Sequence, residues 1–526
     1  MTRRATSVFA FVFTLAIVAV TYVPQIDAPF ELQDDHRIIA PLLTPHPGGI
    51  SGAVRMWAST VRQDVDEVGR FRPVNQIFDV IGPLVLGPHP MLWHCLSIAL
   101  AIAVAALLFI AALRLWQSPA AAAVFALVTL LAPDPGPTAA WYRLGPKEAW
   151  GMLFLAAALA VMARAAGKFR WSTEILLFVL IVLTALSKES FLLLVPALYG
   201  LRVWLDARAT NVSPFAAIGR LRFAGIAYGA LFLAAVVAVA YVVRSAGAHS
   251  YGARSLGGSA GGTMQIVLRD LARTPSLSIW FLPVLLALPA AWRRRRPGAM
   301  TLLAAAIFCA WIGPQFLLHA TRGGFWDHYW LPCLVAFAAI NAASVAMLAH
   351  EPRPILYRVA LLLFGIWLVN SMRIDLSSVI NFKTKARVQQ EAVRIAAANV
   401  TPASILVIVA DADVESERAP SFVDFVSVSG GRFRRALLYD SRCTAQPCRF
   451  VDLRSGQQID SIDRRDISTV VHLDQTQPAV PPSWFSGAAF RSHNAVGSFH
   501  FLSLRHHGWV AIPFTIPVDV LKTGGA

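Results

Sequence analysis

Residues 8–23, VFAFVFTLAIVAVTYV, form an uninterrupted apolar stretch, and the acidic segment ELQDDHR follows it at residues 31–37. The stretch approaches the ~20 residues that an α-helix needs to cross a bilayer. Similar stretches recur over the first two-thirds of the chain; 56% of the 526 residues are hydrophobic and only 14% are charged. A soluble domain carries about 25% charged residues. The sequence therefore predicts a polytopic α-helical membrane protein.

The length criterion predicts about eleven membrane spans. The first apolar stretch lacks a small-residue cleavage site, so we expect it to stay as the first span instead of being removed as a signal peptide. The spans centre on Val8–Val23, Leu92–Leu113, Ala120–Leu131, Ala149–Met162, Ile175–Leu186, Phe191–Leu205, Phe223–Val243, Leu277–Ala291, Met300–Leu318, Tyr329–Met347 and Ile355–Val369.

Lysine and arginine residues mark one side of these spans. Cytoplasmic connections of membrane proteins are enriched in both. With the N-terminus inside, every even-numbered connection is basic, and the Arg293–Arg296 run is the strongest marker. This places the first long loop, about residues 24–90, and the tail, residues 372–526, outside the cytoplasm of an inner-membrane protein. The net charge of +16 then reflects topology and contacts with lipid or phosphate, and nucleic acid is not an expected partner.

The composition changes after Asn370, which predicts two domains. Residues 1–371 would form the transmembrane domain, and residues 372–526 a small extracytoplasmic α/β domain. In this tail the pattern predicts an amphipathic helix over residues 384–398 and strands over residues 405–409, 436–439, 469–473 and 509–513. Cys443 and Cys448 form a C-x4-C pair in the tail and are candidates for a disulfide, because an outside location permits one.

A further helix is predicted in the first long loop. Val54, Trp57, Ala58 and Val61 recur there at helical spacing, which is typical of a helix that lies on the membrane surface with its apolar stripe toward the lipid. An ordinary packed loop helix is the alternative.

Ionisable residues gather on the predicted outside face in five separate segments. Charges at the mouth of a membrane bundle are costly and are usually functional. Arginine and lysine suit a phosphate or diphosphate, and a carboxylate suits deprotonation of an acceptor hydroxyl. The pattern predicts transfer of a sugar from a lipid phosphate. The segments are Asp34-Asp35-His36-Arg37, Arg70-Phe71-Arg72-Pro73, Trp141–Glu148 with Arg143 and Lys147, Ser187-Lys188-Glu189-Ser190, and His319–Tyr329 with Arg322, Asp327 and His328.

These segments resemble the GT-C superfamily of polyprenyl-phosphate-sugar-dependent glycosyltransferases over about residues 1–370. The acidic pair, Arg72-Pro73 and Ser187-Lys188-Glu189 are most similar to the protein O-mannosyltransferase-like branch, and the superfamily also contains the lipid A aminoarabinose transferase. The late outside loop, with His328-Tyr329, departs from the Arg-Tyr or similar pair that is frequent there.

The resemblance implies an inverting glycosyltransferase with a GT-C-like bundle, whose donor is a sugar on a polyprenyl phosphate. It implies Asp34 as catalytic base, with Asp35 positioning the acceptor or a metal. The acceptor would be a glycan, lipid or protein. The donor-phosphate candidates are Arg72, Lys147, Lys188, Arg143 and Arg322, and the other site candidates are His36, Arg37, Glu148, Glu189, His328 and Tyr329. One Asp pair does not make the oxygen cage that Mg or Mn needs, so a divalent cation is left open as a cofactor.

Each interpretation has an alternative. The Asp pair would otherwise be a solvated loop or a helix cap, and Lys188 would pair with Glu189 at a turn between two helices. For the whole protein, the alternatives are an O-antigen ligase or polymerase, and a non-enzymatic lipid-linked sugar flippase or polysaccharide export component. A ligase would place its decisive loop late in the chain, and a flippase would carry charges in mid-span.

Overall fold

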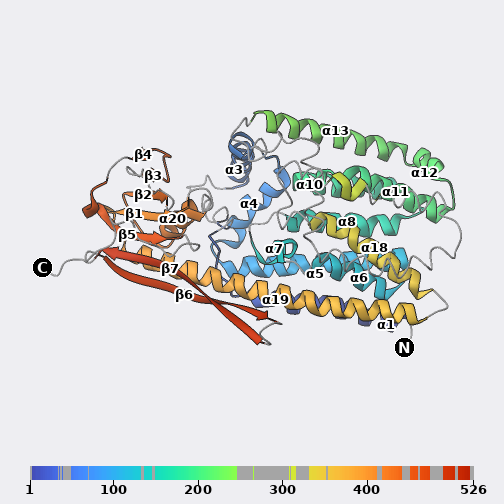
Figure 1. The fold of residues 1–526 in the computed structure, drawn as a ribbon. Coiled ribbons are helices and arrows are strands. Elements are labelled where there is room, and N and C mark those ends of the chain that lie inside the picture. Colours follow the sequence, from blue (N-terminus) through green and yellow to red (C-terminus); the bar gives the residue numbers. More distant parts are fainter. Residues whose placement is uncertain are drawn as a thin grey trace.

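A helical bundle with a mixed β-sheet at one end is the architecture of the protein (Figure 1). The computed structural model describes residues 3–32, 35, 38, 49–68, 70–131, 135–144, 148–245, 265, 307, 310–314, 331–350, 354–411, 418–440, 450–459, 462–473, 490–503 and 508–521. The predicted span at residues 277–291 lies outside them, and that at residues 300–318 lies largely outside.

Apolar sequence forms the bundle helices. Several begin with proline in the first turn, where the missing N–H costs no hydrogen bond, and the Ser118 side chain caps the helix that follows it by accepting from Ala121 N. The helices are α1 (Arg3–Tyr22), α5 (Pro90–Trp116), α6 (Pro119–Leu130), α8 (Glu148–Ala165), α9 (Trp171–Ala185), α10 (Glu189–Leu192), α11 (Val195–Thr210), α12 (Pro214–Arg220), α13 (Arg222–Ser245), α18 (Leu331–Ala349) and α19 (Pro354–Asn399).

Within the described part of the chain, seven helices are long and apolar enough to cross a membrane. Three others, including α6 and α9, are apolar but shorter. The prediction of several apolar helices long enough to span a membrane is therefore confirmed, and the count of about eleven spans is not.

The two ends of the bundle differ in charge. The N-terminus and the short helix α12 lie at one end, and the sheet lies at the other (Figure 1). At the α12 end, Arg202 is buried and pairs with Glu174, at 2.6 Å, while Arg220 pairs with Asp206, at 3.4 Å. The predicted basic connection with Arg202, Arg208, Arg220 and Arg222 thus lies at this end of the bundle, and the Arg293–Arg296 run lies outside the described residues. Which end faces the cytoplasm remains a prediction.

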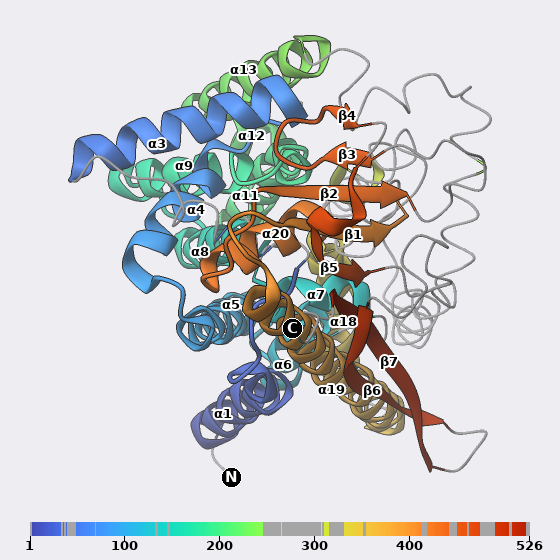
Figure 2. The same cartoon turned by 90° about the vertical axis from the view of Figure 1, so that its left-hand side faces the viewer.

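The first long loop contains two helices, α3 (Ile50–Gln63) and α4 (Pro73–Leu86), joined by a π-helical turn, η2 (Asp64–Val68). Helix α3 runs across the bundle axis, as the two views together show (Figures 1 and 2). Trp57 Nε1 donates to Pro73 O at 2.8 Å, whereas the Ile50 and Val54 side chains are 85% and 53% exposed. The predicted loop helix exists, and its contact with lipid remains a prediction.

Helix α19 corrects the prediction of a separate helix in the tail. It runs without a break for 46 residues, from the last predicted span through residues 384–398. The predicted domain boundary at residues 371 and 372 lies inside this helix and remains a prediction. A single rigid element therefore joins the bundle to the α/β region.

The sheet has the strand order β4-β3-β2-β1-β5-β7-β6 within the described residues. Strand β1 is parallel to β2 and β5, and the other pairs are antiparallel. The four predicted tail strands correspond to β1, β2, β5 and β7. The bounds are β1 (Ile405–Ala410), α20 (Arg418–Val428), β2 (Arg435–Asp440), β3 (Phe450–Asp452), β4 (Gln458–Ile459), β5 (Ile467–His472), β6 (Phe490–Ser503) and β7 (Gly508–Leu521).

Successive side chains of β1 point to opposite faces of the sheet and contribute to two separate hydrophobic cores. Ile405, Val407 and Val409 join one buried cluster on one face of the sheet, while Leu406 and Ile408 join another on the opposite face. The second cluster also contains residues of α19 and α20, together with Phe30, Leu32 and Trp93. The tail therefore shares a hydrophobic core with the segment that follows the first membrane helix.

The arrangement predicts the sidedness of two labelled positions. Ser455 lies at the sheet end, in the turn between β3 and β4, and Ala216 is exposed in α12 at the opposite end. In intact cells a membrane-impermeant maleimide should label Ser455→Cys, and it should label Ala216→Cys only after permeabilisation. The reverse pattern would contradict the orientation derived from the basic connections.

Candidate functional site

The segment that follows α1 is held in place by one face of α19. Leu32 N donates to Gln389 Oε1 at 3.0 Å, and Gln390 Nε2 donates to Phe30 O at 3.1 Å. Arg387 donates to Asp27 Oδ2 at 2.8 Å, and Lys383 also pairs with Asp27. Backbone and side chains of residues 27–32 thus contact successive turns of α19. The predicted catalytic segment begins at the end of this clamp.

Glu31 is the centre of the clamp. Its carboxylate is 1% exposed, forms an ion pair with Lys385, and lies 3.7 Å from Nε of Arg143. Burial alone would raise the pKa of Glu31, but the charges of Lys385 and Arg143, with a smaller effect from Arg418, outweigh it and lower the pKa. Glu31 therefore stays ionised and joins the first loop to both α19 and the end of α7 (Pro135–Tyr142).

Asp35 is the described member of the acidic pair. It is 1% exposed, its Oδ2 accepts a 2.7 Å hydrogen bond from Glu31 N, and its backbone carbonyl accepts from Ile38 N at 2.9 Å. A carboxylate that accepts backbone N–H groups of its own loop fixes the local turn. The Asp35 side chain thus stabilises the loop, and a part in catalysis remains a prediction.

Two buried ion pairs form a second centre at the same end of the bundle. Arg72 Nε donates to both Glu189 carboxylate oxygens, at 3.1 and 3.0 Å, and Arg72 Nη2 lies 2.9 Å from Oε2. Lys188, the neighbour of Glu189, pairs with Glu148. Lys188 thus has a partner on another helix, Glu148, which the sequence alternative of a pair with Glu189 did not name. Instead the two adjacent residues join α10 to the starts of two other helices, α4 and α8.

A short segment links the two centres. Gln25 Nε2 and Ser97 Oγ both donate to the carbonyl of Trp141, at 2.9 and 2.6 Å, and anchor the end of α7. Arg143 follows two residues later and reaches Glu31, and Glu148 opens α8 and pairs with Lys188. Five residues can span at most about 17 Å, so the clamp and the buried pairs belong to one site.

The structure thus brings together six of the predicted residues, Asp35, Arg72, Arg143, Glu148, Lys188 and Glu189. It also adds Glu31, Lys385 and Gln389, which sequence reasoning missed. The available signal was the run of basic residues Lys383, Lys385 and Arg387 at the start of the predicted amphipathic helix. Other predicted residues lie outside the described part of the chain: Asp34, His36, Arg37, Lys147, Arg322, His328, Tyr329, Cys443 and Cys448.

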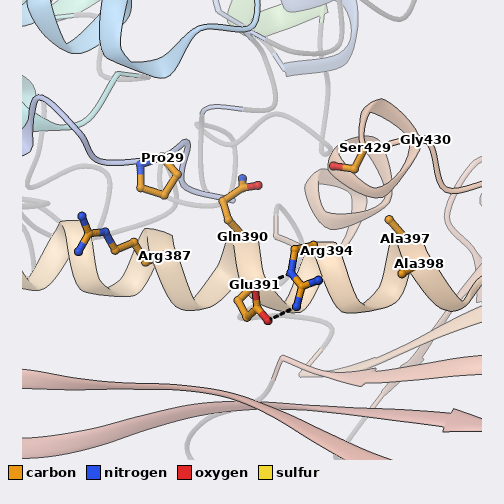
Figure 3. A pocket seen from close by; sticks show the side chains of 9 residues that line it. All are labelled: Pro29, Arg387, Gln390, Glu391, Arg394, Ala397, Ala398, Ser429 and Gly430. Atoms are coloured by element: carbon orange, nitrogen blue, oxygen red, sulfur yellow. Dashed lines mark hydrogen bonds and ion pairs between the residues drawn. The ribbon is translucent and has the colours of Figure 1, made fainter.

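A hollow of about 580 Å³ adjoins the clamp on the outer side of α19. Figure 3 shows the side chains along α19 that line it, with Pro29 and the end of α20 opposite. Arg394 forms an ion pair with Glu391 across one turn, at 2.6 Å. The lining mixes charged and polar side chains with proline and alanine and contains no aromatic residue, so the hollow offers hydrogen-bonding groups next to the acidic segment but no stacking surface for a sugar ring.

Metal ligands do not cluster in the described part of the chain. No group of three or more His, Cys, Asp or Glu side chains there could hold an ion. Asp34, the residue that would complete an Asp pair, lies outside it. Use of a divalent cation by Asp34 and Asp35 remains open.

Neither a protein-family model nor a curated protein sequence matches the chain. Among solved structures, it aligns with the Archaeoglobus fulgidus oligosaccharyltransferase in the apo form, with a TM-score of 0.46 and 9% identity over 81% of this chain and 64% of that one. The same protein tethered to an acceptor peptide with the NVT sequon gives a TM-score of 0.44 and 10% identity over 81% and 63% of the two chains. Its complex with Zn and sulfate gives 0.42 and 11% over 88% and 67%. The chain thus spans just under two thirds of the first of these.

The buried pairs predict a characteristic pattern of stability. Lys188→Met leaves the Glu148 carboxylate buried without this partner, which should lower the free energy of unfolding by about 3–5 kcal/mol. The double variant Lys188→Met/Glu148→Leu should lose much less, because no uncompensated charge remains. Chemical unfolding in detergent measures both.

The matched control for that experiment is the exposed ion pair of Arg62 and Asp66, whose side chains are 84% and 59% exposed. Arg62→Met should change stability little, because water and salt screen an exposed pair. Equal losses in the Lys188 single and double variants would show that the pair does not carry the stability.

The clamp predicts a pH dependence. The pKa of Glu31 is lowered in the folded protein, so its contribution is complete above the ordinary value of 4.5 and is lost as pH falls through the folded pKa. The difference in thermal midpoint between the unaltered protein and Glu31→Gln should therefore be constant above pH 4.5 and shrink below it. Glu391→Gln, at an exposed pair, should give a smaller difference throughout. A Glu31 difference that grows on acidification would contradict the assignment.

Proposed function

We propose that the protein is an inverting glycosyltransferase of GT-C type that moves a sugar from a polyprenyl phosphate to a hydroxyl acceptor at the sheet end of the bundle. The observation that carries the proposal is the meeting of four buried charges from three separate segments, Arg72, Glu148 and the adjacent Lys188 and Glu189, with Arg143 nearby, next to the acidic segment. Buried charges at a membrane bundle are expensive and mark functional sites.

The proposed reaction is a single displacement. The acceptor oxygen forms a bond to the anomeric carbon while the bond from that carbon to the phosphate oxygen breaks. Polyprenyl phosphate leaves with the electron pair, and the acceptor proton passes to the Asp34 carboxylate. Attack in line with the leaving group inverts the anomeric centre. Retention by double displacement would need a second carboxylate as nucleophile, and Asp35 is engaged with the backbone of its own loop.

The basic side chains of the site differ in solvent exposure, and we assign them different roles on that basis. The Arg143 side chain is 29% exposed, whereas Arg72 and Lys188 are nearly buried behind Glu189 and Glu148. A donor phosphate would therefore contact Arg143, and Lys147 close to it in the sequence. Arg72 and Lys188 would stabilise the growing phosphate charge at shorter range once the lipid has displaced water, because fixed charges act more strongly in a dry site.

Helix α19 supplies the support for the base. It holds residues 27–32, which precede Asp34 in the sequence, through Lys383, Lys385 and Gln389, and Asp35, which follows Asp34, accepts from Glu31 N. A general base must lie within hydrogen-bond reach of the proton that it removes. The tail would thus be part of the catalytic unit, and the polar hollow beside Pro29 offers a path for the acceptor.

The test compares two neighbouring carboxylates. If Asp34 takes the acceptor proton, Asp34→Asn should lower turnover by about 10²–10⁴ while donor binding is kept. Asp35→Asn retains an acceptor for Glu31 N and should be the milder change. The measurement is glycosyl transfer from a purified polyprenyl-phosphate sugar, with donor binding measured separately. Arg143→Ala, Arg72→Ala and Lys188→Ala should weaken donor binding.

If both Asp variants turned over at the wild-type rate, the Asp pair would serve only the structure of the loop. The proposal of a glycosyltransferase would then lose its main support. Unchanged donor binding in Arg143→Ala would instead leave the base in place and refute the assignment of the phosphate. The two parts of the proposal therefore fail separately.

A further inference from the structure

Strands β6 and β7 form a hairpin that is much longer than the rest of the sheet. Fourteen residue pairs join them, from Phe490 opposite Leu521 to Ser503 opposite Gly508, whereas β7 pairs with β5 over three residues, Val518 to Val520. Most of the hairpin therefore extends past the sheet. It runs beside α19 toward the bundle and ends near the level of the sheet-side end of α1 (Figure 1).

The middle of the hairpin packs on α19. A side chain at Gly497 would come within 2.6 Å of Val388 Cγ2 and 3.0 Å of Thr384 Cγ2, so the two backbones approach closely there and glycine is required. The rings of Phe499 and Phe514 lie 5.1 Å apart across the two strands. The position of Thr384 therefore gives the height of Gly497 along α19.

The remaining length carries the hairpin down to the apolar part of α19. Six residues from Gly497 to Ser503 cover about 20 Å at 3.3 Å per residue, a distance that corresponds to about 13 residues of α-helix. The hairpin is inclined to α19 (Figures 1 and 2), so this length is an upper limit, and the end of the described strands lies between the heights of Thr384 and residue 371. Lys383 of α19 contacts Pro24 O at 3.4 Å, which places the outer end of the first membrane helix at the upper limit of this range.

Further along the same face, beyond Ser377 and Arg373, α19 carries exposed apolar residues. Ile366 lies 18 residues before Thr384, a whole number of helical turns, so both residues lie on the same face of the helix. The Ile366 and Leu362 side chains are 60% and 64% exposed. An exposed apolar stripe on a membrane-spanning helix faces lipid. The hairpin therefore descends along α19 onto a lipid-facing surface.

The hairpin itself carries apolar residues that the protein does not cover. Val496 and Ile512 are 63% and 50% exposed, and Figure 2 shows the hairpin ending to the side of the described helices. Exposed apolar side chains beside a membrane-spanning helix are typical of segments that lie at the membrane interface.

We propose that the β6–β7 hairpin is a second membrane contact of the tail, and that its lower half lies in the head-group region of the outer leaflet. The occupant is the lipid surface itself, recognised by the exposed apolar side chains of Val496 and Ile512. The hairpin would brace the α/β region against the bilayer at a point distant from α19. This inference depends on the membrane location of the bundle and not on the proposed reaction.

Site-directed fluorescence measures the contact. Full-length protein with its five native cysteines replaced by serine receives Ile512→Cys, Val496→Cys or Arg491→Cys, each labelled with an environment-sensitive fluorophore. The protein is reconstituted into vesicles of phosphatidylethanolamine and phosphatidylglycerol that contain a lipid spin-labelled at the head group. Quenching should be at least about twofold stronger at Ile512 than at Arg491, with Val496 between them, because apolar interfacial residues lie at head-group depth.

Arg491 is the matched control, because it is exposed on the same hairpin at the end that pairs with Val520 near the sheet. Equal quenching at the three positions would overturn the proposal. Protection of Ile512 from both the spin-labelled lipid and aqueous iodide would also overturn it, since another protein surface would then cover the hairpin. If Ile512→Cys prevents folding, the comparison of Val496→Cys with Arg491→Cys tests the proposal instead, because Val496 is more exposed than Ile512.

Discussion

The buried ion pairs at the sheet end of the bundle are the constraint on which the rest of the site depends. Lys188 and Glu189 are adjacent, yet each pairs with a different helix, α8 through Glu148 and α4 through Arg72. Removing water from four charges is costly unless each finds a partner with good geometry. The starts of three helices must therefore meet at the short connection between α9 and α10, and that meeting point is where the site lies.

Helix α19 extends this constraint beyond the membrane part of the bundle. Its apolar first half packs with the bundle, and its polar second half holds the segment that follows α1 through Lys383, Lys385 and Gln389. Within the bundle it accepts a 2.8 Å hydrogen bond from Thr138 Oγ1 at the buried Asp375. One helix thus aligns the acidic segment, the end of α7 and the α/β region, so none of them can shift independently of the others.

Much of the fold could be predicted from the sequence, because hydrophobic length and alternation are local properties. They located α1, α5 and α18 and four of the tail strands. The continuity of α19 could not be predicted, since Arg373 and Asp375 resemble the end of a span until their partners are known. Strand β6 was missed because Gly497 and several polar residues interrupt its alternation, and the reason for Gly497 is the approach of Thr384 and Val388 on α19.

The site residues show the same division between local and long-range information. Sequence position indicated that Arg72, Glu148, Lys188 and Glu189 gather on one side, since helix ends alternate between the two faces of a bundle. It did not indicate which cation meets which carboxylate, because 40 residues separate Lys188 from Glu148 and 117 separate Arg72 from Glu189. Glu31 was overlooked for a related reason: its partner Lys385 lies 354 residues away.

The acidic segment shows how neighbouring carboxylates come to differ in function. Glu31 is ionised but held among cations, and Asp35 accepts the Glu31 amide within its own turn. Both side chains are therefore used to build the loop, and neither can leave its partner without loosening the backbone. A base must instead be free to take and release a proton in each turnover. In the proposed reaction the proton therefore falls to Asp34, the remaining acidic residue of the segment, and Glu31 and Asp35 would build the loop around it.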